Sequence, residues 1–347
     1  SADWAYSALV DWGVRFADRR NHPARAFHAA GRGDVRAAPI LLETANNDNK
    51  TAMLRASAIT QLGRLLPDKL MPSLSLWIES DEPLIRLAAL EALGQLPPEQ
   101  RQAGLMRSSE DPVLAVRMVA AEHLAAIVPQ SRGAGGEATF TKPEQSEPTV
   151  ERPQPDPFSK LFEEYLLVRS QHLDMPLVLT QLAGFQQSRG DEAQAEALLL
   201  AALEKNPQAS ASRVNLADLY RTQGKEAAAR STLEAGIRLT ERDGSLWFSL
   251  ALLEVREGND TAALRALEKA AMLEETPGYY HYVYAVAQND QGRPEEALAT
   301  LKATHRAAPG QPNILAALVQ YSQLAGDMDS ARRYQTELRA TLRDAGL

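Results

Sequence analysis

The chain has 347 residues, a formal net charge of −8 and a pI near 5.4. This acidic balance disfavours a nucleic-acid binder, which needs a basic face against phosphate. The absence of cysteine excludes disulfides, thiolate metal sites, Cys-x-x-Cys-His haem attachment and cysteine nucleophiles within this sequence. No apolar run approaches the length of a transmembrane helix. The sequence begins at Ser1 without a signal segment, and we expect a mature or trimmed piece of a longer protein.

The first segment, residues 4–20, places large apolar side chains at helical spacing: Trp4, Leu9, Trp12 and Phe16. We interpret it as a capping helix that lays its aromatic side chains on the first repeat, with an aromatic docking surface as the alternative. Pro23 predicts a break after it, because proline disfavours helical geometry in the residue before it.

A period of 31 residues follows between about 35 and 127. The recurring positions are Arg55, Arg86 and Arg117; Ala58, Ala89 and Ala120; Leu62, Leu93 and Leu124. Asn49, Ser80 and Asp111 stand ahead of the second helices at the same spacing, and we predict that they are the helix N-caps. The intervening first helices are predicted over 35–44, 68–78 and 99–106.

These columns resemble HEAT-type repeats, which are short helix pairs with Ala-rich inner helices and an arginine in the second helix. The resemblance implies that Arg55, Arg86 and Arg117 bond to loop groups of the adjacent repeat. It also implies a helical repeat domain over residues 1–128 that includes the capping helix.

Residues 129–157 are rich in proline and glycine and almost devoid of large apolar side chains. Such a segment cannot bury enough surface to offset its ordering entropy, so we predict a linker. An amphipathic helix is predicted over 158–173, where it would cap the open end of a following array.

That array is marked by a period of 34 residues. Its columns are Gly190, Gly224, Gly258, Gly292 and Gly326, and five residues later Ala195, Ala229, Ala263, Ala297 and Ala331. Glycine permits the tight turn between paired helices, and alanine lets the helices approach closely. A fixed period of this length predicts a stacked array of helix pairs.

The columns resemble the tetratricopeptide pattern. Five repeats are assigned: 176–209, 210–243, 244–277, 278–311 and 312–345. We therefore predict an all-α fold, an α-solenoid of HEAT-like repeats followed by a tetratricopeptide domain over 158–347. The fifth repeat loses its late columns, as expected where no further repeat stacks.

Nothing in the sequence predicts catalysis or a cofactor. No two histidines lie at i, i+4 on a predicted helix, and none has a carboxylate at zinc-ligand spacing. There is no phosphate-cradling loop and no nucleophile elbow. We therefore predict a protein that is not an enzyme and holds neither a metal nor a cofactor.

The tetratricopeptide resemblance implies that the first helix of each repeat lines a concave binding groove. The groove residues it assigns are Asn215, Asp218, Arg221, Phe248, Leu252, Val255, Arg256, Tyr279, Tyr282, Val286 and Asn289. An apolar and aromatic centre with charged flanks suits a partner's helix or extended peptide better than a charged terminus. Of the family's carboxylate-clamp positions only Asn215 matches, so we predict no such clamp. The alternative is that the linker or a second copy of the chain fills the groove.

At the scale of the whole chain, three segments resemble the C-terminal portion of bacterial multihaem c-type cytochromes: 21–34, 162–174 and 278–298. Their haem motifs are missing here, so haem binding is not carried over. The resemblance implies a bacterial, periplasmic protein, with a cytoplasmic location as the alternative. Two hypotheses stay open: an interaction scaffold, or a docking module of a redox assembly whose catalytic part lies outside this chain. A homodimer is compatible with either.

Overall fold

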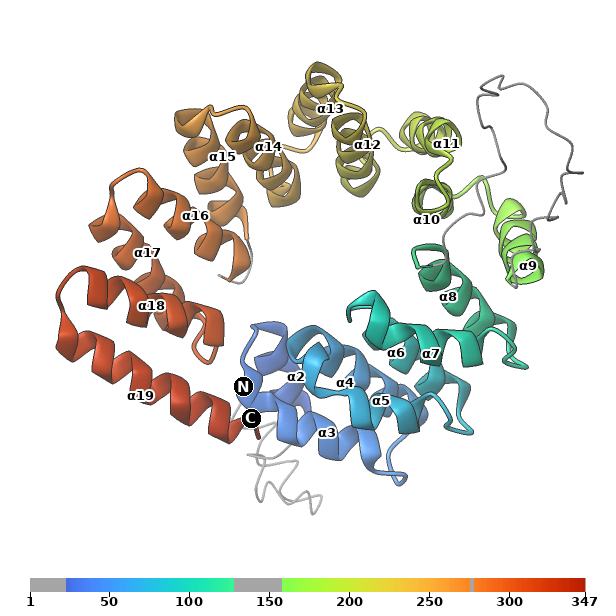
Figure 1. Cartoon of the computed structure of the whole chain (residues 1–347), viewed down its shortest axis with the longest axis horizontal. Coiled ribbons are helices and arrows are strands. Elements are labelled where there is room, and N and C mark those ends of the chain that lie inside the picture. The colour runs from blue at the N-terminus through green and yellow to red at the C-terminus, as the bar shows by residue number, and fades with distance from the viewer. Residues whose placement is uncertain (1–22, 128–157, 275–277, 347) are drawn as a thin grey trace, which may run out of the picture. The chain divides into compact units, whose positions relative to one another are not determined.

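The computed structural model describes residues 23–127, 158–274 and 278–346, and within these ranges it contains only helices and their connections (Figure 1). The predicted all-α solenoid of helix pairs is therefore confirmed. The predicted capping helix at 4–20 and the predicted linker at 129–157 lie outside the described residues.

Contacts group the chain into two compact units. Unit 1 combines residues 1–95 with 274–347, and unit 2 comprises 96–273. The domain boundaries that we predicted follow repeat type instead, and they stay a prediction.

Unit 2 begins within the 31-residue period and continues into the array. Its helices are α7 (Pro98–Ser108), α8 (Leu114–Ala125), α9 (Ser159–Ser170), α10 (Pro176–Ser188), α11 (Glu192–Lys205), α12 (Ser210–Thr222), α13 (Glu226–Leu239), α14 (Gly244–Arg256) and α15 (Asp260–Leu273).

Unit 1 contains the first helices of the described chain and the last two repeats. Its helices are α2 (Pro23–Gly31), the 3-10 turn η2 (Val35–Ala37), α3 (Ala38–Asn46), α4 (Ala52–Leu65), the 3-10 turn η3 (Pro67–Lys69), α5 (Met71–Trp77), α6 (Pro83–Leu93), α16 (Tyr279–Asp290), α17 (Pro294–Ala307), α18 (Pro312–Leu324) and α19 (Met328–Asp344).

The glycine and alanine columns of the array take the roles predicted for them. All five glycines have a positive φ, between 70° and 80°, just after the first helix of their repeats. Side chains other than glycine are strained there, which explains the exact spacing. The five alanines are at most 2% exposed, so a larger side chain would push the paired helices apart.

The 31-residue region also packs its helices closely. A Cβ added to Gly63 of α4 would lie 2.6 Å from the Cβ of Ala92 on α6. Leu62 and Leu93 are buried beside this contact. The glycine therefore marks a place where two helix backbones approach each other.

The arginines of this column bond to backbone carbonyls just ahead of their own helices, in a loop for Arg86 and Arg117 and at the end of α3 for Arg55. Arg55 donates to the carbonyl of Ala45, Arg86 donates to that of Ser80, and Arg117 donates to that of Asp111. The distances are 3.0, 2.7 and 2.7 Å. Each arginine thus fixes the turn that leads into its helix.

The predicted N-caps lie two residues before the observed ones, which are Thr51, Glu82 and Val113. Helix α4 is capped by Thr51, whose hydroxyl accepts from the backbone N–H of Leu54. Ser80 and Asp111 instead accept from the N–H two residues on, 3.3 and 2.8 Å away. Such residues hydrogen-bond the local backbone in turns as readily as at helix ends, and this explains the error. The 35–44 and 68–78 helices also begin later than predicted, each after a 3-10 turn.

Helix α9 joins α8 to the first helix of the array within unit 2. Tyr165 of α9 is buried and stacks on Phe185 of α10, with ring centroids 4.6 Å apart. Glu164 accepts two hydrogen bonds from Arg117 of α8, at 2.8 and 2.6 Å. The helix predicted at 158–173 is present, although it ends at Ser170.

Candidate partner-binding groove

In unit 2, the predicted groove residues lie on α12 and α14, the neighbouring first helices of repeats 2 and 3. Phe248, Leu252 and Val255 follow one another at i, i+4 and i+7, so they share one face of α14. Phe248 is half-buried, while Leu252 and Val255 are 37% and 52% exposed. Apolar side chains are thus presented to solvent at the helical spacing predicted from the sequence.

Polar side chains flank this apolar face. On α12, the Arg221 guanidinium lies 3.4 Å from the Asp218 carboxylate, and Asn215 is half-buried on the same helix. Arg256 is exposed at the end of α14. We call this set of seven residues the α12–α14 face. Its members are Asn215, Asp218, Arg221, Phe248, Leu252, Val255 and Arg256.

Next to Val255 on α14, the buried carboxylate of Glu254 pairs with Arg230 of α13. Glu254 is 6% exposed and accepts from both terminal nitrogens of Arg230. Asn259 donates to the same carboxylate at 2.9 Å. The hydrogen bond from Arg230 holds the pKa of Glu254 below its ordinary value. The pair therefore helps to fix the packing of α14 against α13, the second helix of repeat 2.

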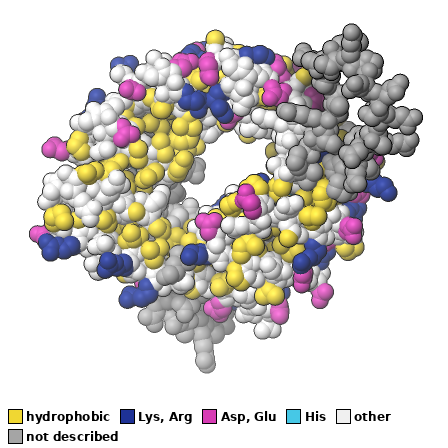
Figure 2. All heavy atoms as spheres, viewed as in Figure 1, with side chains coloured by type: hydrophobic (Ala, Val, Ile, Leu, Met, Phe, Trp, Pro, Cys, Tyr) yellow, Lys and Arg dark blue, Asp and Glu magenta, His cyan; other side chains and the backbone are white. Residues whose placement is uncertain are grey.

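In unit 1, the predicted groove residues on α16 divide into exposed and packed side chains. Tyr279 is 58% exposed, whereas Tyr282 packs against the core formed by α17, α18 and α19. Val286 and Asn289 are half-buried. Tyr282 therefore contributes to the stacking of repeats 4 and 5. Figure 2 shows hydrophobic side chains gathered over α16 and α18.

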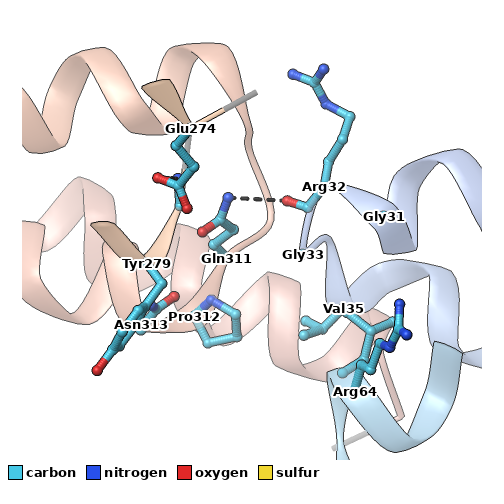
Figure 3. Close-up of a pocket in the computed structure, with 12 residues that line it drawn as sticks. Gly31, Arg32, Gly33, Val35, Arg64, Glu274, Tyr279, Gln311, Pro312 and Asn313 are labelled. Carbon is cyan, nitrogen blue, oxygen red and sulfur yellow. Dashed lines mark hydrogen bonds between the residues drawn. The ribbon is translucent and has the colours of Figure 1, made fainter. Parts of the chain in front are cut away.

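Tyr279 lines a pocket of about 380 Å³ within unit 1. In Figure 3, Tyr279 and Glu274 stand on one side and Val35 and Arg64 on the other. Gln311 reaches across and donates to the carbonyl of Arg32 at 3.0 Å. No sequence pattern predicted this pocket, because its walls come from segments more than 200 residues apart.

A second pocket, of about 300 Å³, lies in unit 2 between α8, α10 and α12. Thr180, Gly184 and Asn215 line it. The Thr180 hydroxyl lies 2.7 Å from that of Ser212. A Cβ at Gly184 would meet nothing within 4 Å.

Two histidines of the array lie beside carboxylates. His281 lies 2.9 Å from Glu274, and His305 lies 3.1 Å from Glu337. Within the described residues, no three potential ligands gather as a metal site would require. No helix in the described ranges combines the length and apolar character needed to cross a bilayer.

Solved structures similar to this chain include MamA, with 17% identity, a TM-score of 0.40, and coverage of 47% of this chain and 96% of that chain. YrrB, described as a tetratricopeptide protein with an unusual peptide-binding site, has 17% identity, a TM-score of 0.38 and coverage of 51% and 92%. PilF of Pseudomonas aeruginosa has 17% identity, a TM-score of 0.41 and coverage of 50% and 78%. No curated protein matches this chain.

The family model described as Tetratricopeptide repeat matches three overlapping segments, residues 186–243, 215–280 and 250–312. These segments coincide with the 34-residue period and with helices α11 to α17. The HEAT-type and cytochrome resemblances are not matched in this way and stay predictions. Residues 186–312 of this chain are therefore similar to tetratricopeptide repeats.

Proposed function

We propose that this chain is a non-catalytic interaction scaffold that binds an apolar helix or extended peptide of a partner protein on the α12–α14 face. The observation that carries the proposal is the exposed apolar stripe of α14. Leu252 and Val255 are large apolar side chains that the fold leaves in solvent beside a buried core. Tetratricopeptide repeats supply the scaffold, and the stripe supplies the contact.

The composition of this face favours a peptide over a small molecule or a nucleic acid. An apolar centre with a polar rim is how protein interfaces are built. Arg221 is paired with Asp218, which leaves no concentrated positive charge for phosphate. A partner helix with apolar side chains at i, i+3/i+4 and i+7 would match the spacing of the stripe.

The test uses the full chain and a displayed-peptide library. Peptides are selected on the chain and their affinity is measured by fluorescence anisotropy. We expect peptides with a periodic apolar pattern. Replacing Val255 by Ser removes apolar area worth roughly 1–1.5 kcal/mol, so affinity should fall about tenfold.

Met272→Ser is the matched control, because Met272 is 71% exposed and lies on α15, the second helix of repeat 3. It should leave the affinity unchanged. If Met272→Ser weakens binding as much as Val255→Ser does, or if neither changes it, the site is not the α12–α14 face.

We further propose a periplasmic location, which rests on the cytochrome resemblance of segments such as 278–298. Fractionation of the native host with an antibody against the chain tests it. Recovery in the cytoplasmic fraction would favour the cytoplasmic alternative and would not affect the proposed binding face.

A further inference from the structure

Within unit 1, the turn that follows α2 docks onto the turn that begins the fifth repeat. Val35 donates its backbone N–H to the carbonyl of Gly310 at 3.2 Å. Gln311 donates to the carbonyl of Arg32, and Arg32 donates to that of Ala307. We call residues 31–36 the latch and residues 307–311 the entry turn.

The fit between the latch and the entry turn depends on a glycine. Gly310 has φ +83°, and a Cβ added there would lie 2.1 Å from the Asp34 carboxylate. Asp34 cannot easily move away, because it accepts from the backbone N–H of Arg36 at 3.0 Å and pairs with its guanidinium at 2.7 Å. Only a residue without a side chain allows this approach.

The latch contact has a small buried centre and few hydrogen bonds. Val35 is 3% exposed and Gln311 is 6% exposed, while the other latch residues are half-buried or exposed. In each described hydrogen bond between the latch and the entry turn, the acceptor is a neutral backbone carbonyl. No described ion pair joins the two, although Arg36 is attracted to Glu337 and Asp344 of α19. Contacts of this kind open locally before the protein unfolds.

We propose that the latch is a reversible closure that fastens the first helices of the chain to its last two repeats. In the docked form, Gly33 and Val35 form the wall of the pocket opposite Tyr279.

The test exploits the absence of cysteine from the chain. Val35→Cys places one thiol in the latch, and its labelling rate with a maleimide reports how often the latch opens. Adding Gly310→Ala should raise that rate at least tenfold. Gly292→Ala is the matched control, because Gly292 has φ +73° and nothing within 4 Å of its Cβ position. Equal rates in the two glycine variants would overturn the proposal.

Two further measurements separate latch opening from loss of the fold. Leu301→Cys, a thiol placed in the core of α17, should label slowly in both glycine variants. Asp34→Ala combined with Gly310→Ala should slow Val35→Cys labelling again, and failure to do so would contradict the fit.

If Gly310→Ala unfolds the chain, hydrogen exchange on the unsubstituted chain decides. The amide of Val35 should exchange faster than that of Leu315 within α18. Equal exchange rates would mean that the latch opens only when the chain unfolds, and they would refute the proposed reversible closure. None of these readings involves a partner, so failure of the proposed function would leave them intact.

Discussion

Replacing Arg230 by methionine would leave the Glu254 carboxylate buried without its cation. Arg230 of α13 contacts two carboxylates, those of Glu254 and Glu257. The Glu257 carboxylate lies 2.5 Å from the guanidinium and is more exposed than that of Glu254. Removing one partner of a buried ion pair costs about 3–5 kcal/mol when both groups are fully buried. The Arg230 side chain is 28% exposed, so we place the cost near the lower end, at about 3 kcal/mol.

The assay is urea unfolding followed by circular dichroism, with the double variant Arg230→Met/Glu254→Leu as control. Because two apolar side chains of similar volume leave no orphaned charge, the double variant should regain most of the lost stability. If the double variant is as unstable as the single one, packing rather than an orphaned charge explains the loss, and the reasoning is refuted.

The same pair predicts how stability depends on pH. The pKa of Glu254 is lowered in the folded chain by its hydrogen bond to Arg230. A group with a depressed folded pKa contributes stability that is complete above its unfolded pKa, near 4.5, and lost as pH falls through the folded value. Glu254→Gln should therefore flatten the decline of the urea midpoint below about pH 4.5. An unchanged decline would contradict this assignment.

Two further predictions concern packing. Tyr165→Phe should alter stability by less than about 1.5 kcal/mol, whereas Tyr165→Ala should cost about 3–5 kcal/mol, because the ring stacks on Phe185. If thermal unfolding shows similar losses for the two variants, the hydroxyl and not the ring carries the stability. Gly63→Ala should destabilise by about 1–3 kcal/mol, since its Cβ would lie 2.6 Å from that of Ala92. Gly184→Ala should stabilise the chain by about 0.5–1 kcal/mol, because nothing lies near its Cβ position. A higher thermal midpoint for Gly63→Ala than for Gly184→Ala would contradict the packing argument.

The repeats could be predicted because every copy imposes the same backbone and packing requirements at the same positions. A glycine such as Gly224 needs a positive φ, and an alanine such as Ala229 needs a close helix contact, in every copy. Both requirements restrict the residue type severely, so they leave a period in the sequence.

The latch and the Tyr279 pocket could not be predicted in the same way. Each contact there is made once, between residues such as Arg32 and Gln311 that are 279 positions apart. A single glycine at 310 carries no periodic signal, and its meaning depends on which side chain it meets.

The groove was only partly predictable, because one position of a repeat can serve two roles. Tyr282 and Phe248 both occupy the fifth position of a first helix. Phe248 belongs to the exposed stripe of α14, but Tyr282 packs against the core of repeats 4 and 5.

The most direct test of the account is hydrogen exchange of the full chain with and without a selected peptide, read by mass spectrometry. We predict that protection concentrates in α12 and α14, over residues 215–222 and 248–256, and disappears in the Val255→Ser variant. Protection confined to the second helices α13 and α15 would contradict the claim that the α12–α14 face binds the partner.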